Sequence, residues 1–395
     1  MTQTEVLCIC EPPMSGVPVY IEQIVRRLHG NGFHITVLCP PGNILHTTLA
    51  DTGIQLLKID LRPFTPLNAF KATFQLSALL RRCSFDLVHL HSSKAGLIGR
   101  PVCALFGIPT IFTPHCFSFE SVHRSRAKSA VYLFFEKLLG HCTSHIACVS
   151  ESEAASARQY RIVPDERISA IPCFVDAQRW KPRPSSPNAR AALGFPPDAP
   201  IIGTISRFHA QKAPLDFVTM ADALLRKRPS ARFLFIGEDG PLRPAMEQKI
   251  RALRLQNKIV IRSWTSDLPA FVALIDVVVL NSLWEGLPLS IIEAMAMAKP
   301  IVATSLPGTR ELIADSDCGI LVPPAQPGAM AEAVHNLLDA PERMRTLGAC
   351  GRAKALAHYS LDQAVDSTAR LYNQLAAANP GLHRSRRSDP HPLEF

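Results

Sequence analysis

The feature that most constrains the fold is a repeated alternation of short apolar runs with longer segments of helical periodicity. In the first half, runs such as EVLCIC, HITVLCP and DLVHLH alternate with segments such as VPVYIEQIVRRLHG. The same rhythm restarts with IIGTIS, ARFLFIG, KIVIRS and DVVVLN. Strands that alternate with helices are typical of parallel sheets covered by helices on both faces. We therefore expect an α/β protein with two doubly wound, Rossmann-like parallel-sheet domains facing a cleft, with ligands at the carboxyl ends of the strands.

Chain length and one proline-crowded stretch indicate the domain organisation. The 395 residues exceed one ordinary core, and RWKPRPSSPNARAALGFPPDAP is rich in proline and weak in periodicity. The expected parts are an N-terminal domain over residues 1–180, a linker over 181–198, a C-terminal domain over 199–360, a helix over 361–378 that crosses back to the N-terminal domain, and a disordered tail over 379–395.

Composition excludes several classes of function. The eleven cysteines form no pair of Cys-x-x-Cys units, and they fit small buried residues in a reducing, cytoplasmic compartment. No run is long enough for a membrane span, and the N-terminus does not resemble a signal peptide. The net charge of +9 suggests an anionic partner. Because the basic residues are spread out and aromatics make up only 7 %, a nucleic acid is not favoured.

One stretch, NSLWEGLPLSIIEAMAMAKPIVAT, joins a polar loop directly to an apolar helix. Pro288 suits the first turn of that helix, and the amides near Leu289 and Ser290 would form a ready anion site. Gly286 lets a ligand approach the backbone closely. Glu293, one turn inside the helix, could accept hydrogen bonds from sugar hydroxyls. The alternative is a surface loop followed by an acid that stabilises the helix dipole.

A second loop, in GTISRFHAQKAPLDFV, places Arg207 and Lys212 after the first strand of the same domain. Two cations in one such loop can neutralise a diphosphate, although an isolated pair is more simply explained as solvated charge. The loops in FLFIGEDGPLR and IRSWTSDLPAF also follow strands. Four unusual loops at strand ends favour a ligand site over packing.

Together, ISRFHAQKAPLDF, FLFIGEDGPLR, the long stretch through EGLPLSIIEAMA and GTRELIADSDCGILVPP resemble the retaining glycosyltransferases of family 4, which have the GT-B fold. Glu285 and Glu293, with seven residues between them, match the family's signature. MSGVPVYIEQIVRRLHG is similar to the family's glycine-rich first loop and helix, with Gly16 near the donor phosphates. His115 in TPHCFSFE falls on the active-site histidine.

Two departures from the family pattern are visible. Ser15 and Gly16 stand where relatives carry two adjacent glycines. IPCFVD replaces the usual IPNGVD, so that Cys173 and Phe174 stand in place of Asn and Gly.

The resemblance implies transfer of a hexose-type sugar, with retention, from a nucleotide-diphosphate sugar, most commonly UDP-linked, to a lipid-linked or polysaccharide-precursor acceptor. It assigns the nucleotide sugar to the C-terminal domain and the acceptor to the N-terminal domain. The implied catalytic residues are His115 and Glu285. The implied donor-binding residues are Gly16, Arg207, Lys212, Gly286, Leu289, Ser290 and Glu293.

No metal or other cofactor is expected, because two cations and a helix terminus can hold the diphosphate. The triplet Asp315–Asp317 imitates the metal-binding Asp-x-Asp motif of the other major transferase fold, an interpretation we do not favour. His89 and His91 could be metal ligands, but with no third ligand in view a structural or substrate-lining role is favoured.

Three alternatives stay open. The segment from His123 to Gly140 is either an interfacial helix touching an anionic membrane at its inner face or an ordinary helix packed on the first sheet. A GT-B epimerase or hydrolase would act on the nucleotide sugar without an acceptor. A non-catalytic subunit would only bind it.

Overall fold

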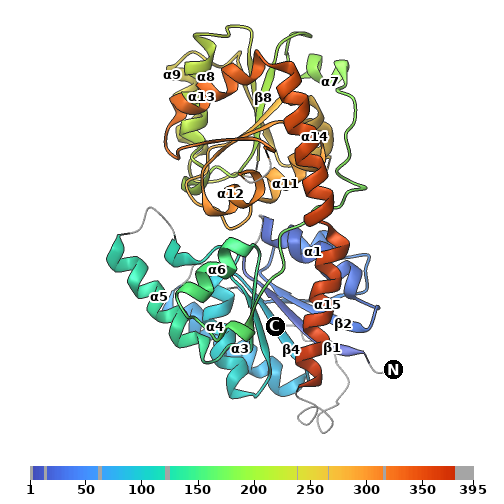
Figure 1. Cartoon of the computed structure of the whole chain (residues 1–395). Coiled ribbons are helices and arrows are strands. Elements are labelled where there is room, and N and C mark those ends of the chain that lie inside the picture. The colour runs from blue at the N-terminus through green and yellow to red at the C-terminus, as the bar shows by residue number, and fades with distance from the viewer. Residues whose placement is uncertain are drawn as a thin grey trace. The chain divides into compact units, whose positions relative to one another are not determined.

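The computed structural model describes residues 3–12, 16–60, 65–120, 125–237, 239–265, 267–314 and 317–378. The chain divides into two compact units: unit 1 comprises Met1–Pro172 and Leu361–Phe395, and unit 2 comprises Cys173–Ser360. Each unit is a parallel sheet with helices packed on it, as Figure 1 shows, so the α/β prediction is confirmed. The predicted tail over 379–395 lies outside the described residues.

The described part of unit 1 contains a seven-stranded parallel sheet in the order β3-β2-β1-β4-β5-β6-β7. Its strands are β1 (Thr4–Cys10), β2 (Phe33–Cys39), β3 (Gln55–Lys58), β4 (Leu87–His91), β5 (Thr110–Thr113), β6 (His145–Cys148) and β7 (Ile168–Ala170). Its helices are α1 (Gly16–Leu28), α2 (Leu45–Thr48), α3 (Pro66–Arg82), α4 (Ser93–Leu105), α5 (Arg126–Gly140), α6 (Glu151–Gln159) and α15 (Leu361–Ala377), with 3-10 turns η1 (Ser118–Glu120) and η2 (Asp165–Arg167).

The central strands of unit 1 are apolar because helices cover both of their faces. All five residues of β4 are buried, as are Val6 and Leu7 of β1. The strand order reverses between β1 and β4, and such a reversal leaves a crevice at the carboxyl ends of the two strands. The loops after β1 and β4 are therefore where unit 1 would hold a ligand.

Helix α15 is built into unit 1 although it comes last in the chain. It packs against α1 and β4, and Tyr372 from this helix is almost fully buried. The Tyr372 hydroxyl lies 2.8 Å from Nδ1 of His89 in β4. The C-terminal helix thus forms part of the core beneath the carboxyl end of β4.

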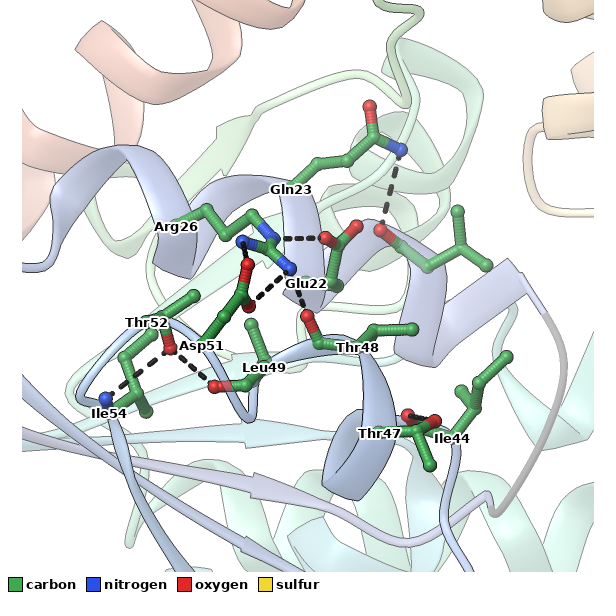
Figure 2. Close-up of polar contacts among 11 residues, drawn as sticks. Glu22, Gln23, Arg26, Ile44, Thr47, Thr48, Leu49, Asp51, Thr52 and Ile54 are labelled. Atoms are coloured by element: carbon green, nitrogen blue, oxygen red, sulfur yellow. Dashed lines mark hydrogen bonds and ion pairs between the residues drawn. The ribbon is translucent and has the colours of Figure 1, made fainter. Parts of the chain in front are cut away.

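Helix α1 is held against α2 and the turn after it by one arginine. Figure 2 shows Arg26 between Glu22, the carbonyl of Thr48 and the carboxylate of Asp51. The Nε–Oε1 distance to Glu22 is 2.5 Å, and the Nη2–Oδ1 distance to Asp51 is 3.1 Å. Because Asp51 is exposed, this pair contributes little to stability. Its main effect is to fix the orientation of the helix that begins at Gly16.

The described part of unit 2 contains a six-stranded parallel sheet in the order β10-β9-β8-β11-β12-β13. Its strands are β8 (Ile201–Ile205), β9 (Arg232–Gly237), β10 (Ile259–Ser263), β11 (Val277–Leu280), β12 (Ile301–Thr304) and β13 (Ile320–Val322). Its helices are α7 (Pro187–Ala192), α8 (Pro214–Leu225), α9 (Arg243–Ala252), α10 (Leu268–Leu274), α11 (Leu289–Ala296), α12 (Pro307–Ile313), α13 (Pro327–Leu338) and α14 (Pro341–His358), with the 3-10 turn η3 (Ala210–Lys212).

The proline-rich stretch expected as a linker is anchored to unit 2. Arg190, in α7, donates to the carbonyl of Ala199 at 2.8 Å and to the carboxylate of Asp276 at 3.1 Å. Asp276 also accepts the amide of Ile201 at 2.8 Å. These bonds fasten the stretch to the start of β8, so it is ordered in spite of its composition.

Candidate active site

The topological reversal in unit 2 lies between β8 and β11, and the loops after these two strands carry most of the predicted site. Lys212, at the end of the β8 loop, forms an ion pair with Glu285 in the β11 loop. Their side chains keep only 13 % and 7 % of their surface exposed. Two residues separated by 73 positions, both predicted from sequence, are therefore paired where a ligand would bind.

Gln211 connects the same two loops and was not among the predicted residues. Its side-chain amide donates to the carbonyl of Trp284 at 2.9 Å and lies 3.5 Å from Glu285 Oε2. Its side-chain oxygen accepts from Arg207 Nη2 at 2.9 Å, and its backbone carbonyl accepts the amide of Leu283 at 2.8 Å. Through this one side chain Arg207 is held next to the Lys212–Glu285 pair.

The backbone around these loops is tightly constrained. Ala213, directly after Lys212, has φ +44°, which is rare for a residue with a Cβ. A Cβ on Gly308, at the start of α12, would lie 1.9 Å from the carbonyl oxygen of Gly286. The start of α12 therefore packs directly on the EGLP loop, and only glycine at position 308 permits this approach. Such constraint is typical of functional loops.

Helix α11 begins at Leu289 in the structure, so Pro288, expected in its first turn, precedes the helix. Its N-cap is Pro288, whose side chain forms no capping hydrogen bond, so the first amides at Leu289 and Ser290 have no side-chain cap. Amides at such a position, with the positive end of the helix dipole, suit a phosphate. The anion site expected at these amides stays a prediction.

Glu293 lies one turn inside α11, and its carboxyl is crowded by neighbours although the residue is only half-buried. Burial raises the pKa of Glu293 to about 8, and the nearby charge of Arg179 acts in the opposite direction. The turn that carries Arg179 is shaped by Asp176, whose Oδ1 accepts the amide of Gln178 at 2.9 Å. The Glu293 carboxyl, near Arg179, is therefore a candidate for hydrogen bonds with a hydroxyl-rich ligand.

Three further polar atoms are buried at these strand ends without a hydrogen-bond partner among the described residues: Ser206 Oγ, Asn281 Oδ1 and Ser282 Oγ. All three follow β8 or β11 directly. Buried polar groups normally find partners, so orphaned ones are a mark of functional or hydrated sites. The end of this sheet is thus more polar than packing requires.

In unit 1 the corresponding sheet end is lined by histidines. His115 Nε2 lies 3.1 Å from His91 Nδ1, and the His91 ring lies against the His89 ring at a tilt, with centroids 3.9 Å apart. His89 Nε2 lies 2.8 Å from Thr113 Oγ1, so both nitrogens of His89 have protein partners. Burial lowers the pKa of His89 and of His115 to about 3 and holds the pKa of His91 well below its ordinary value. All three imidazoles are therefore neutral at physiological pH.

The backbone at His115 is strained and is held by a buried carboxylate. His115 has φ +55° and Cys116 has φ +100°, both in the region that favours glycine. Glu153, in the first turn of α6, accepts the amide of Cys116 at 2.6 Å through Oε1 and the amide of Val149 at 2.8 Å through Oε2. Glu153 is 3 % exposed, and it acts as a clamp on the loop that presents His115.

Two more polar residues lie at this end of unit 1. Lys94, in the first turn of α4, pairs with Glu11 after β1 at 2.8 Å, and the Glu11 side chain is 9 % exposed. Gly16 begins α1, but Ser15 and the rest of the predicted glycine-rich loop lie outside the described residues. The contribution of that loop stays a prediction.

Two parts of the sequence offer possible metal ligands: the pair His89 and His91, and the triplet Asp315–Asp317. Within the described ranges no group of three or more His, Cys, Asp or Glu residues is arranged to hold a metal ion. His89 and His91 are hydrogen-bonded to Tyr372 and His115, and their structural or substrate-lining role stays a prediction. Asp315, needed for the Asp-x-Asp interpretation, lies outside the described residues.

Gln211, Glu153 and Arg179 are the site residues that sequence reasoning missed. Gln211 lies inside the HAQKAP motif, so the motif itself was a signal for it. Glu153 in VSESEAA and Arg179 in DAQRW follow no recognisable spacing, and only the fold brings them to His115 and Glu293.

None of the helices in the described residues combines the length and the hydropathy that a membrane span requires.

Comparison with known proteins places these features in a family. Residues 14–179 match the family model described as Glycosyltransferase Family 4, and residues 199–340 match the model described as Glycosyl transferases group 1. The chain is 29 % identical over 317 residues to UDP-Gal:alpha-D-GlcNAc-diphosphoundecaprenol alpha-1,3-galactosyltransferase of Escherichia coli, covering 79 % of this chain and 81 % of the relative. It is 28 % identical to alpha-D-kanosaminyltransferase of Streptomyces kanamyceticus, covering 75 % of this chain and 79 % of the relative.

Solved structures show the same fold. HepE of Anabaena, in complex with UDP and glucose, superimposes with a TM-score of 0.82 at 19 % identity over 94 % of this chain and 100 % of that one. Sucrose-phosphate synthase of Thermosynechococcus elongatus gives 0.82 at 22 % identity over 95 % and 100 %. The two family models together cover most of the sequence, and the sheets match these structures. The chain therefore belongs to the family 4 glycosyltransferases, which have the GT-B fold.

Proposed function

We propose that this glycosyltransferase moves a hexose-type sugar from a UDP-sugar, with retention of anomeric configuration, to a lipid-linked or polysaccharide-precursor acceptor in the cytoplasm. The observation that carries the proposal is the Lys212–Glu285 pair at the strand reversal of unit 2, beside Arg207 and the start of α11. The E. coli relative is named for a UDP-galactose donor and a diphosphoundecaprenol-linked acceptor, and the HepE structure contains UDP and glucose. Both names support this choice of donor.

Unit 2 would bind the departing diphosphate. A lysine ammonium has three N–H donors, so Lys212 can keep its bond to Glu285 while donating to a phosphate oxygen. Arg207, held by Gln211, and the first amides of α11 would add donors for the same group. Donors fixed before the reaction and aimed at developing charge are the largest single contribution in many enzymes.

The carboxylates would bind the sugars of the donor. Glu293 would accept hydrogen bonds from the ribose hydroxyls, and Glu285, oriented by Lys212 and Gln211, would contact hydroxyls of the transferred sugar. Gly286 would permit close approach of the donor to the loop. In unit 1, His115 is neutral and would contribute a hydrogen bond to the sugar rather than a charge.

The chemistry proposed needs no general base from the protein. As the bond between the anomeric carbon and the diphosphate oxygen breaks, the sugar becomes oxocarbenium-like. The acceptor oxygen then bonds to the anomeric carbon on the same face, and the leaving diphosphate takes the proton of the acceptor hydroxyl. That arrangement retains the configuration. The cations and amides of unit 2 carry out the charge stabilisation that a metal supplies elsewhere, so we also propose that activity is independent of metal ions.

A nucleotide-release assay tests the function. Purified protein is incubated with a set of nucleotide sugars, with and without bacterial lipid extract, and UDP and product are followed by mass spectrometry. We expect UDP release that requires the extract, persists in EDTA and is lost in Glu285→Gln. NMR of the product would show the retained anomer.

Other outcomes would contradict the proposal. Release of free sugar without extract would indicate a hydrolase, and interconversion of the nucleotide sugar would indicate an epimerase. Binding of UDP without turnover on any acceptor would indicate a non-catalytic subunit. Activity lost in EDTA and restored by manganese would contradict the metal-free chemistry.

A further inference from the structure

Three neighbouring helices of unit 1 carry large apolar side chains that face solvent. Helix α4 packs against both α3 and α5, and Figure 1 shows the three on the same side of the unit. We call their outer surface the α3–α5 face. Its exposed aromatic and aliphatic members include Leu67, Phe70 and Phe74 of α3, Leu105 of α4, and Val131, Phe134, Phe135 and Leu138 of α5.

The exposure of these residues is unusual for a surface helix. Phe70 is 70 % exposed and Phe134 is 64 % exposed. In α3 the inward positions are apolar as well, including Ala72, Leu76 and Leu79, so apolar side chains occupy both the inner and the outer side of this helix. An ordinary surface helix is polar on its outer side. Phe134 and Phe135 of α5 therefore do not pack on the sheet, which favours the interfacial alternative for this helix.

The charges of the face have one sign. In the described helices α3, α4 and α5, six basic residues are exposed or near-surface on the two outer helices: Lys71, Arg81, Arg82, Arg126, Lys128 and Lys137. Neither α3 nor α4 contains an acidic residue, and α5 contains one, Glu136. An apolar surface whose three helices expose cations and no acid is complementary to an anionic surface.

The single acid of these helices is hidden from the face. Glu136 Oε2 lies 2.9 Å from Arg100 Nη1, with side-chain exposures of 7 % and 0 %. The Arg100 guanidinium also lies over the Phe112 ring, 4.0 Å from its centroid. A paired charge buried this deeply fixes how α5 sits on α4, because separating the two groups would leave an unpaired buried charge. Its position keeps the aromatics of α5 turned outward.

We propose that the α3–α5 face docks on an anionic lipid bilayer, with its aromatic and aliphatic side chains in the interfacial region and its basic side chains against lipid phosphates. A second copy of the chain is a poorer occupant, because two such faces would bring together the cations of these helices, which expose no acid of their own. Aromatic and basic side chains together are the pattern that binds the interfacial region of anionic membranes.

The inference deepens the proposed function, since a lipid-linked acceptor would be reached at the surface to which unit 1 binds. It rests on the proposed function for its biological role only. Vesicle binding requires neither donor nor turnover, so the two can fail separately.

Vesicle flotation tests the docking. The full chain is mixed with phosphatidylcholine vesicles, with or without phosphatidylglycerol, and the floated fraction is measured. We expect binding to the anionic vesicles only, and its loss at ~1 M salt, where the Debye length is about 3 Å. Phe70→Ser/Phe134→Ser should abolish flotation. Lys71→Glu and Lys128→Glu should each lower the partition coefficient by about fivefold or more.

Matched controls lie on unit 2. Leu253→Ser removes an exposed leucine and Arg251→Glu reverses an exposed cation of α9, and neither should change flotation. All variants change exposed side chains, and melting curves would confirm that they fold. Flotation unchanged in the double serine variant, or equal binding to neutral vesicles, would overturn the proposal. A concentration-dependent dimer by light scattering that the same variant dissolves would assign the face to self-association instead.

Discussion

The same type of sheet edge is used in opposite ways by the two units. In unit 2 the loops after β8 and β11 hold an almost buried ion pair, Lys212–Glu285, with Arg207 beside it. In unit 1 the carboxyl ends of β4 and β5 lead to His91 and His115, whose imidazoles burial keeps neutral. One edge is therefore suited to a highly charged diphosphate, and the other to uncharged hydroxyl groups. Topology provides a place for a ligand, and the loops decide its electrostatics.

The largest effect is expected from removing the cation of unit 2. Lys212→Met would delete a donor to the leaving diphosphate and leave Glu285 buried without its partner. We expect kcat to fall by about 10²–10³-fold and stability to fall by about 3–5 kcal/mol. Steady-state UDP release and denaturant unfolding measure the two effects.

A double variant separates catalysis from folding. Lys212→Met/Glu285→Gln removes both charges and should recover much of the lost stability while activity stays low. Wild-type kcat in the single variant would show that Lys212 does not touch the reacting diphosphate.

The second prediction concerns the acid sensitivity of unit 1. His89 and His91 are buried and neutral, and their pKa values lie far below the 6.5 of an exposed histidine. Below pH 6.5 the unfolded chain binds protons that the folded chain does not, so stability is present above that pH and is lost as pH falls toward about 3. The loss is roughly 2 kcal/mol per histidine between pH 6.5 and pH 5.

Hydrogen exchange followed by mass spectrometry measures this difference. Amides of β4 and β5 should lose protection between pH 7 and pH 5, after correction for the intrinsic rate, more than amides of β8 and β11. Equal losses in the two sheets would mean that the histidines are not neutral in the folded protein.

The third prediction concerns the clamp on His115. Glu153→Gln replaces one carboxylate oxygen with an amide group that cannot accept a hydrogen bond, so either Cys116 or Val149 loses its acceptor. We expect a loss of about 1–3 kcal/mol in stability and a reduced kcat with little change in the KM for the donor. Glu151→Gln, in the same helical turn, is the matched control and should change neither.

If Glu153 only stabilised the fold, kcat measured well below the melting temperature would remain at the wild-type level. Such a result would remove its role in positioning His115.

The amino-acid sequence was sufficient for the architecture and for the charged edge of unit 2. Apolar runs of strand length end where the polar loops begin, and this pattern alone places Arg207, Lys212 and Glu285 at strand ends. The sheet edge of unit 1 that carries the neutral histidines was harder to predict from the sequence. Tyr372 meets His89 across 283 positions, and Glu153 reaches the loop of His115 from another helix. No local sequence pattern predicts contacts between residues that lie so far apart in the chain.

Helix α5 shows a different limit of prediction from the sequence. Periodicity indicates which residues share one side of a helix, but when several sides are apolar it does not tell which side faces the core. The outward direction of Phe134 follows from the burial of Glu136 against Arg100, and a buried charge pair is not visible in the sequence.

The smallest effect is expected at Glu293, an acid of unit 2 whose neutral form is favoured by burial. Its pKa of about 8 means that the free protein carries it protonated at pH 7. If ribose hydroxyls donate to its ionised form, UDP binding releases a proton, and affinity rises with pH until about pH 8. The gain is at most about tenfold per pH unit, and calorimetry between pH 6.5 and 8.5 should show a severalfold increase. Glu293→Gln should bind UDP with little dependence on pH, at an affinity near that of wild type at low pH. Wild-type affinity that stays flat or falls as pH rises would mean that Glu293 remains protonated in the complex and donates a hydrogen bond. Glu293 would then bind the ribose as an uncharged group, as the neutral histidines of unit 1 are proposed to bind hydroxyls.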